Sequence, residues 1–282
     1  VATTTSDSNG DFSQASLNLG YHSVTYSKSG YLGVTLTELL ETDGETLNLE
    51  TVRLLDDNCT SGTMSGNITN AVTGDNMSGV NLWYIKGKNK HFKWWQGTYF
   101  GQTDENGVWS LPNSNYPSSI SEGWYTILSN KSGYYKDYHN AEVCGDISNQ
   151  NNALSSQLNE GEMRIMLKWP KTDPVTASDL DSYLYSPDGS GGWHTIYWLN
   201  DIQDYGADGK VTLDKDATAP PGDETITISK IRSGTYQFKV HNFYDFLPGK
   251  TTILKKSKAM VKVYYNDGNS ITKKDYPVTN DN

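Results

Sequence analysis

Short runs of alternating hydrophobic and polar residues dominate this chain, and such alternation is typical of half-buried β-strands. Two of the runs, Met64–Asn67 and Val80–Ile85, are separated by turn-forming residues at Thr73–Asn76. The best candidate for a helix, Leu36–Leu55, is broken by Asp43-Gly44 and is better explained as two strands. The pattern therefore predicts an all-β protein.

Part of this pattern occurs twice. The stretch Ser6–Ser13, "SDSNGDFS", matches Thr103–Ser110, "TDENGVWS". Gly20–Tyr31 matches Gly123–Tyr134, and both of these stretches finish with Lys-Ser-Gly-Tyr. An Asn-Gly pair between half-apolar runs is a strong β-hairpin signal, because a type I′ turn needs positive φ at both central residues. The repeated unit is therefore a module of β-hairpins.

The two copies differ in what precedes them. The predicted strands at 64–67 and 80–85 lie in front of the second copy, and nothing equivalent precedes the first copy. We predict a partial module at 1–58 that lacks its first strands, a complete β-sandwich at 59–145, a linker at 146–157 and a different β-sandwich at 158–282. An incomplete sandwich leaves strand edges unpaired. We expect those edges to be completed by further residues of a longer chain or by a strand from a neighbouring molecule.

The composition restricts the class of protein. Of the 282 residues, 35% are hydrophobic and 12% aromatic, and the net charge is −10. Nucleic-acid binding requires a basic surface, and insertion into a membrane requires about 18 consecutive apolar residues; the sequence offers neither. An acidic chain rich in Asn, Thr and Tyr is typical of an extracellular or cell-surface protein, where net charge maintains solubility.

The two cysteines flank the complete module. Cys59 precedes its first strand and Cys144 follows its last strand. The first and last strands of a sandwich are often neighbours, and disulfides persist in oxidising compartments. We therefore predict a Cys59–Cys144 disulfide that closes the module, with two unrelated buried thiols as the alternative.

Three stretches of the complete module follow a known pattern: "GNITNAVTGDNMSGVNLWY" (66–84), "TDENGVWS" (103–110) and "GWYTILSNKSGYY" (123–135). On these residues the module resembles the carboxypeptidase regulatory-like family, with Lys88–Tyr99 as an insertion. The resemblance implies tandem antiparallel β-sandwiches of the immunoglobulin-like or transthyretin-like type. In that family the domain serves as a spacer, a folding aid or a binding module.

The third segment carries other motifs, among them "MRIMLKW" (163–169), "SDLDSYL" (178–184), "WHTIYW" (193–198), "LDKD" (213–216) and "GTYQFKVHNF" (234–243). On these residues it resembles a less characterised family of β-sandwich domains from bacterial surface and secreted proteins. The resemblance implies no catalytic activity. The family pattern continues with another aromatic strand, so we expect this sandwich to lack its last strand.

Carboxylates in the third segment are candidate metal ligands. Asp179 and Asp181 alternate, as do Asp214 and Asp216, and residues two apart on a strand face the same side of the sheet. Glu224 follows a Pro-Pro-Gly turn as a further candidate. Because Ca²⁺ takes about six to eight oxygen ligands, these residues predict a Ca²⁺ site. Carboxylates on turns and on solvent-facing strand positions are the alternative.

Other site chemistry has weaker support. His194 and His241 are candidate ligands for zinc, although single histidines on strands are more often structural. The hydrolase motif Gly-x-Ser-x-Gly and the metalloprotease motif His-Glu-x-x-His do not occur in the sequence. We therefore expect a protein that is not an enzyme.

Aromatic residues in the insertion are candidates for a ligand or interface site. Trp94, Trp95 and Tyr99 lie in "HFKWWQGTYF" (91–100), and Trp83 lies on the preceding strand. Consecutive residues on a strand point to opposite faces, so one of the paired tryptophans is expected to be exposed or at an interface. Exposed aromatic rings stack on sugar rings, and Trp and Tyr are enriched in protein–protein interfaces.

These features favour a non-enzymatic extracellular segment of tandem β-sandwiches with a structural, adhesive or filament-forming role. Self-assembly through open β edges is the expected protein–protein contact. The alternative is a carbohydrate-binding or accessory region of a secreted hydrolase, in which the aromatic residues bind a glycan.

Overall fold

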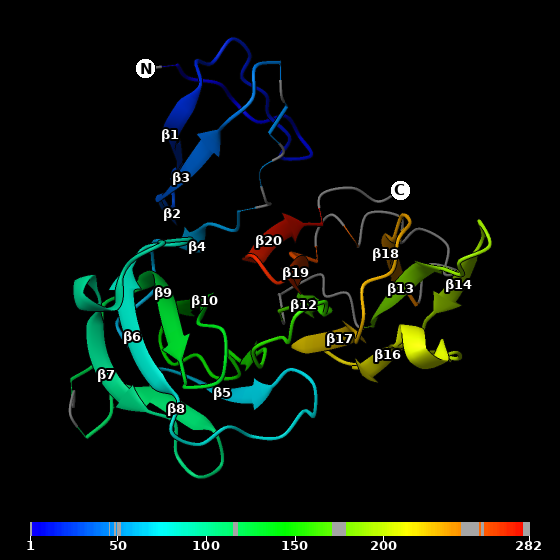
Figure 1. Ribbon diagram of the computed structural model, residues 1–282. Coiled ribbons are helices and arrows are strands. Elements are labelled where there is room, and N and C mark those ends of the chain that lie inside the picture. The colour runs from blue at the N-terminus through cyan, green and yellow to red at the C-terminus, as the bar shows by residue number, and fades with distance from the viewer. Residues whose placement is uncertain are drawn as a thin grey trace.

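The computed structural model describes residues 2–44, 46–47, 49, 52–114, 118–170, 179–243, 254 and 257–278. Within these residues the regular structure is almost entirely β, as the alternating pattern predicts. Figure 1 shows three successive groups of strands: an N-terminal group in blue, a middle sandwich in cyan and green, and a third sandwich in green, yellow and red.

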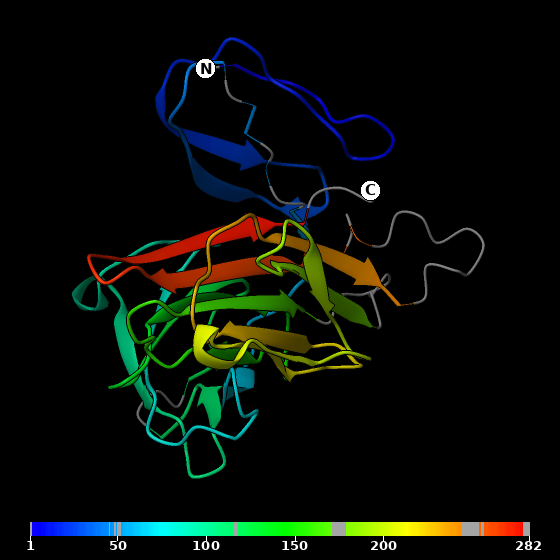
Figure 2. The ribbon, with the colours of Figure 1, turned by 45° about the vertical axis from the view of Figure 1, so that its right-hand side comes forward.

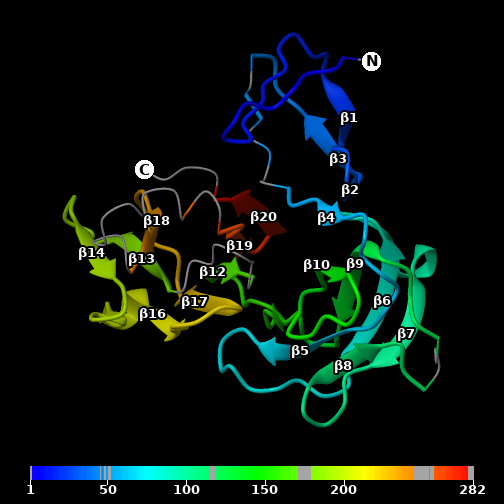
Figure 3. The ribbon, with the colours of Figure 1, turned by 180° about the vertical axis from the view of Figure 1, so that it is seen from behind.

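The N-terminal group consists of two small sheets. β1 (Gly20–Tyr26) pairs with β3 (Val34–Leu40), and β2 (Tyr31–Leu32) pairs with β4 (Leu55–Asp56). Its large exposed apolar side chains are Phe12, Leu17, Leu19, Tyr21, Tyr31 and Leu47. Figure 3 shows from behind that β4 is the strand of this group that lies next to the middle sandwich. The described residues among the first 58 therefore do not form a closed sandwich.

The middle sandwich encloses its own core with two sheets. The order of the four-stranded sheet is β10 (Asp137–Val143), β9 (Gly123–Asn130), β6 (Asn81–Lys86) and β7 (Thr98–Gln102). The order of the three-stranded sheet is β11 (Asn152–Leu154), β5 (Met64–Asn70) and β8 (Val108–Leu111). The strands predicted at 64–67 and 80–85 correspond to β5 and β6. The core between the sheets includes Met64, Leu82, Trp109 and Ile127.

The β1–β3 hairpin has the same register as the β9–β10 hairpin. Gly20 lies opposite Leu40, just as Gly123 lies opposite Val143. The two hairpins differ in their surroundings, because β9 also pairs with β6, whereas β1 has no second partner among the described residues. The repeat in the sequence is therefore a repeat in the structure, with one copy less completely covered.

Strand β11 lies within the segment that the sequence predicts as a linker. Its three residues are buried, and they pair in parallel with the end of β5, where Asn152 lies opposite Ile68. Two apolar residues in a polar stretch give no alternating pattern, so local sequence does not indicate this strand. The predicted linker thus contributes a strand to the middle sandwich.

The third sandwich has a larger and a smaller sheet. The order of the six-stranded sheet is β15 (Ile202–Asp204), β16 (Lys210–Lys215), β17 (Gly222–Ile228), β12 (Met163–Trp169), β19 (Met260–Asn266) and β20 (Ile271–Pro277). The order of the three-stranded sheet is β14 (Trp193–Ile196), β13 (Leu180–Pro187) and β18 (Gln237–Asn242). Figure 2 shows β12, β19 and β20 side by side. The core includes Leu167, Leu184 and Ile226.

Two short 3₁₀ turns complete the described elements: η1 (Trp94–Gln96) and η2 (Gly206–Asp208). In the described part of the chain, no helix has the length and apolarity needed to cross a membrane.

The middle and third sandwiches meet at a buried ionic cluster. Asp137 on β10 has a side chain that is only 1% exposed. Its carboxylate accepts hydrogen bonds from Lys168 on β12 at 3.2 Å, Lys262 on β19 at 2.9 Å and Lys273 on β20 at 2.7 Å. One carboxylate of the middle sandwich is thus held by three strands of the third.

Further contacts extend this interface. Arg164 on β12 donates to Ser155 Oγ and to the Ser156 carbonyl, both at 2.8 Å. The rings of Tyr135 and Tyr264 stack with centroids 5.1 Å apart. Because polar and aromatic groups from both sandwiches are paired and buried here, relative motion of the two sandwiches would break specific contacts.

Candidate functional site

Four carboxylates gather where β13 and β17 begin and β16 ends, and we call them the acidic cluster. Asp181 lies on β13, Glu224 on β17, and Asp216 directly follows β16. One carboxylate oxygen from each of these three residues lies within 4.8 Å of the other two. Asp179, which precedes β13, is buried and interacts with Asp181 and Asp216. The cluster therefore draws on both sheets of the third sandwich.

Neighbouring groups hold part of the acidic cluster in place. The backbone N–H of Ser182 donates to Glu224 Oε2 at 2.6 Å. His241 on β18 lies opposite Asp181, and its Nδ1 is 3.1 Å from Asp181 Oδ2. Glu224 Oε1 and Asp179 Oδ1, however, are buried without a hydrogen-bond partner. Buried carboxylate oxygens normally have partners, so the cluster has unused capacity to coordinate a ligand.

The crowding of like charges perturbs the acidic cluster. Burial raises the pKa of Glu224 to about 9, and the adjacent Asp216 carboxyl adds to this shift. Burial, together with repulsion from Asp181 and Asp216, raises the pKa of Asp179 to about 6. Burial also raises the pKa of Asp181, although the hydrogen bond with His241 opposes this effect. A bound divalent cation would lower these pKa values, because it favours the ionised carboxylates.

The structure does not bring Asp214 into the acidic cluster. A register shift between Leu213 and Lys215 interrupts the alternation that places Asp214 and Asp216 on one face in the sequence prediction. Asp214 interacts instead with Thr227 and Arg164. A β-bulge adds one residue to one strand and re-aims the following side chains, so the prediction that both aspartates share a face is wrong.

The two candidate histidines lie in different surroundings. His241 contacts the acidic cluster through Asp181, whereas His194 packs beside Tyr205 with ring centroids 5.5 Å apart. Among the described residues, the three groups that approach closely enough to share an ion are all carboxylates. Such an all-oxygen set favours a hard cation over zinc, which prefers nitrogen and sulfur ligands.

Sequence reasoning missed how the acidic cluster is supported. Ser182 acts through its backbone N–H, which side-chain patterns do not indicate. The pairing of His241 with Asp181 depends on the β13–β18 register. The alternating runs around both residues signal two strands, but they do not say that those strands are neighbours.

The four predicted aromatic residues form one surface, which we call the aromatic surface. Trp94 and Trp95 lie on η1 rather than on a strand, and they are 58% and 61% exposed. The ring of Trp83 lies 6.4 Å from that of Trp94 and 5.2 Å from that of Tyr99. A hollow of about 310 Å³ adjoins the two exposed rings, lined also by Lys93, Leu128, Asn130 and Lys136. The prediction of a shared strand was wrong, but the predicted exposure is present.

The insertion that carries these tryptophans is anchored to the sheet beneath it. Phe92 is buried and packs edge-on against Tyr138 of β10, with centroids 5.5 Å apart. The backbone N–H of Asn89 donates to Asn140 Oδ1 at 2.8 Å. These contacts fix the insertion against β10 and present Trp94 and Trp95 to solvent on a supported base.

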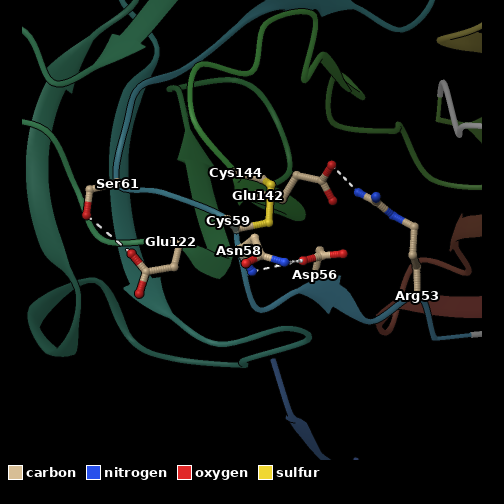
Figure 4. The surroundings of a disulfide bond; sticks show 8 residues. All are labelled: Arg53, Asp56, Asn58, Cys59, Ser61, Glu122, Glu142 and Cys144. Carbon is tan, nitrogen blue, oxygen red and sulfur yellow. Dashed lines mark hydrogen bonds and ion pairs between the residues drawn. A yellow bond between two sulfur atoms is a disulfide. The ribbon is translucent and has the colours of Figure 1, made fainter. Parts of the chain in front are cut away.

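The predicted disulfide joins Cys59 to Cys144, whose Cα atoms are 4.5 Å apart. Figure 4 shows it beside an ion pair between Arg53 and Glu142. The carbonyl of Arg53 also accepts the indole N–H of Trp124 at 3.2 Å. The disulfide thus closes the middle sandwich, and the contacts of Arg53 attach the preceding segment to it.

No protein-family model matches the chain, and no curated protein matches it. The resemblance to the carboxypeptidase regulatory-like family therefore remains a prediction. Among solved structures, the chain is similar to the TIE protein of Bacillus anthracis, with 14% identity, a TM-score of 0.26, and 98% of this chain and 42% of that chain covered.

Two pilins are similar at the same level. The major pilin subunit BcpA of Bacillus cereus has 12% identity and a TM-score of 0.26, with 77% of this chain and 68% of that chain covered. A streptococcal ancillary pilin has 12% identity and a TM-score of 0.24, with 92% and 72% covered. By these coverages, the chain spans less than half the length of the TIE protein and about two thirds to three quarters of the two pilins.

Proposed function

We propose that this chain is a non-enzymatic structural segment of an extracellular surface, adhesive or filament-forming protein. The observation that carries this proposal is the buried ionic cluster around Asp137. Adjacent domains usually move relative to one another unless their interface is substantial. Here a carboxylate of one sandwich is held by three lysines of the next. A joint of this kind transmits force between sandwiches instead of bending, as a stalk or filament requires.

The N-terminal group supports assembly as part of this function. In the middle sandwich, β6 covers the edge of β9. The equivalent edge of β1 has no such partner in the described residues, and Tyr21 on β1 is 77% exposed. Open strand edges bind additional strands through backbone hydrogen bonds. We propose that a strand from another molecule pairs with β1 as β6 pairs with β9.

Sedimentation velocity and negative-stain microscopy of the full chain over a range of concentrations test this function. We expect concentration-dependent oligomers or fibres. A chain that remains monomeric at every concentration would contradict assembly through β1.

The Cys59–Cys144 disulfide is consistent with an extracellular location, because such bonds persist outside the reducing cytosol.

Glycan binding is the second candidate function, and the aromatic surface favours it. Two adjacent, exposed tryptophans beside a hollow provide flat apolar faces for the faces of sugar rings. The flanking Lys93, Asn130 and Lys136 can hydrogen-bond to hydroxyl groups. The same surface also fits a protein partner, since Trp is enriched at interfaces.

A glycan array with matched variants separates these possibilities. Binding that is lost in Trp94→Ala and retained in Trp193→Ala, which removes an equally prominent tryptophan with 51% exposure from the third sandwich, would favour glycan recognition. An array without any signal would leave the structural function as the better explanation of the aromatic surface.

A further inference from the structure

We infer that the third sandwich contains a Ca²⁺ site in the acidic cluster, with Asp181, Asp216 and Glu224 as the carboxylate ligands and Asp179 as an adjoining carboxylate. The inference goes beyond the structural function and does not depend on it. It rests on the geometry of the carboxylates, on their buried oxygens without partners, and on their origin in two different sheets.

The geometry of the acidic cluster matches the size of a Ca²⁺ coordination sphere. Ca²⁺–oxygen distances are about 2.3–2.6 Å, so ligands on opposite sides of the ion lie about 4.6–5.2 Å apart. The ligand oxygens of Asp181, Asp216 and Glu224 lie within 4.8 Å of one another. One ion can therefore contact all three without a rearrangement of the strands.

The buried oxygens provide a second, independent observation. Glu224 is 1% exposed and Asp179 is 6% exposed, yet Glu224 Oε1 and Asp179 Oδ1 have no hydrogen-bond partner. Glu224 can hydrogen-bond to the adjacent Asp216 carboxyl only while one of the two groups carries a proton, because two ionised carboxylates are both acceptors. A buried ionised carboxylate needs a cation or a donor, and a bound Ca²⁺ would supply the cation for Glu224 in place of the proton.

The surrounding protein leaves the required lone pairs available. Ser182 holds only one oxygen of Glu224, Oε2, and His241 holds Asp181 through Oδ2. These contacts orient the two ligands from behind, as groups around a metal site commonly do. The other oxygen of each carboxylate is not held by these two groups, and an ion would replace the proton shared between Glu224 and Asp216.

The position of the site gives the ion a structural effect. Asp181 belongs to the three-stranded sheet, whereas Glu224 belongs to the six-stranded sheet. An ion bound to both would tie the two sheets together at one end of the sandwich. Because the ion binds the folded chain and not the unfolded chain, it raises the melting temperature.

Calorimetry and isothermal titration of the full chain test the site with Ca²⁺ as the probe. We expect a saturable heat of binding and a melting temperature several degrees higher in Ca²⁺ than in chelator. Terbium, which substitutes for Ca²⁺, offers an independent readout, because the stacked rings of Tyr183 and Tyr197 lie near His241 and can sensitise its luminescence. Absence of all three signals would overturn the inference.

Two variants distinguish coordination from a merely structural role. Glu224→Gln retains an oxygen for the Ser182 N–H and is uncharged, so in chelator it should melt at the same temperature as the natural chain or higher. Addition of Ca²⁺ should raise the melting temperature of this variant much less than that of the natural chain, and its affinity for Ca²⁺ should fall at least tenfold. Asp181→Asn should likewise lose most of the Ca²⁺-dependent rise in melting temperature.

Asp214→Asn is the matched control, because this carboxylate lies near Arg164 and Thr227 instead of the acidic cluster. Whatever its own stability, its Ca²⁺-dependent increase in melting temperature should be unchanged. A full increase in Glu224→Gln, or a lost increase in Asp214→Asn, would contradict the assignment of ligands. Replacing Ca²⁺ with Mg²⁺ tests selectivity, and we expect a smaller increase because Mg²⁺ demands a tighter octahedral shell.

Discussion

The carboxylate of Asp137 on β10 lies 2.9 Å from the ammonium group of Lys262 on β19, in the interface between the middle and third sandwiches. Burial alone would raise the pKa of Asp137, but Lys262, Lys168 and Lys273 hold it well below its usual range. The pair is thus ionised and buried on both sides. A buried ion pair of this kind adds little net stability by its attraction alone. Removal of one partner is costly because it leaves the other charge buried and unpaired.

We expect Asp137→Asn to lower the free energy of unfolding by about 3–5 kcal/mol, because it leaves buried ammonium groups without their shared anion. Chemical denaturation followed by tryptophan fluorescence measures this loss. The matched control is Asp275→Asn, which removes another partner of Lys262, at 3.2 Å, from a side chain that is 36% exposed. Its effect should stay within about 1 kcal/mol. Equal losses in the two variants would contradict the role of burial.

The disulfide should contribute strongly to the stability of the middle sandwich. Its cysteines are separated by 85 residues, and cross-linking a long loop restricts the unfolded chain. We expect the double variant Cys59→Ser, Cys144→Ser to lower the free energy of unfolding by about 2–5 kcal/mol. Mass spectrometry of unreduced peptides provides the direct check. Two thiols that are alkylated in the native protein would show that the bond is not formed.

His139 on β10 should make folding sensitive to acid. Burial lowers its pKa to about 3, and Lys168 and Lys262 add to this effect, although Asp137 opposes it. The folded chain therefore keeps the ring neutral, whereas the unfolded chain takes up a proton below about pH 6.5. Stability is fully retained above that pH and falls by about 1.4 kcal/mol per pH unit as the pH decreases toward 3.

Denaturation curves at several pH values, compared between the natural chain and His139→Gln, isolate this contribution. Other groups titrate in the same range, so the informative quantity is the difference in slope between the two proteins. The variant should lose stability less steeply between pH 6.5 and about 4. Parallel curves would mean that His139 takes up a proton as readily in the folded chain as in the unfolded chain.

The sequence pattern predicted those strands and turns that depend mainly on residues close together in the chain. The alternating runs around Val24 and Leu82 predict strands, and the Asn-Gly pairs predict turns, because both depend on neighbouring residues. The prediction of type I′ hairpins at these pairs is wrong, because only the glycines have positive φ and the strands on either side of the second pair, β7 and β8, belong to different sheets. β11 was missed because Asn152 becomes part of a strand only through its partner Ile68, far away in the sequence. Pairing between distant segments is not encoded in the local pattern.

The acidic cluster shows the same division. Acidic residues in the third segment indicated the chemistry, and Asp181, Asp216 and Glu224 do lie together. The exclusion of Asp214 depends on a register shift that alternation alone does not reveal. Asp137 was not singled out, although Lys262 is the one charged residue in a largely apolar strand and such a charge often has a buried partner.

The repeated turns allow a matched comparison of two glycines. Gly10 and Gly107 both have positive φ, at 87° and 74°. An added Cβ at Gly107 would lie 2.7 Å from the Ile68 carbonyl oxygen and 2.9 Å from the Met77 nitrogen, whereas nothing lies within 4 Å of one at Gly10. Gly10→Ala should therefore cost only the strain of left-handed backbone, about 1–2 kcal/mol.

Gly107→Ala carries the same strain and adds clashes with backbone atoms on two sides, so its loss of stability should be clearly larger. Thermal denaturation of both variants measures the difference. Equal losses would mean that the turn after Asp104 is as open as the turn after Asp7, and that the packing of the middle sandwich around this turn is looser than described.

Hydrogen exchange should distinguish the two repeated hairpins. β9 is paired on both sides, with β6 and β10, whereas β1 is paired with β3 alone among the described residues. Amides that face an unpaired edge are exposed to solvent and exchange quickly. At low protein concentration we expect about half of the amides of β1 to exchange much faster than those of β9, which serves as the internal control. If a strand from another molecule adds to β1, its protection should increase with concentration while that of β9 stays constant. Full protection of β1 at the lowest concentration would mean that its edge is already covered within the single chain, and strand addition at β1 would then be excluded.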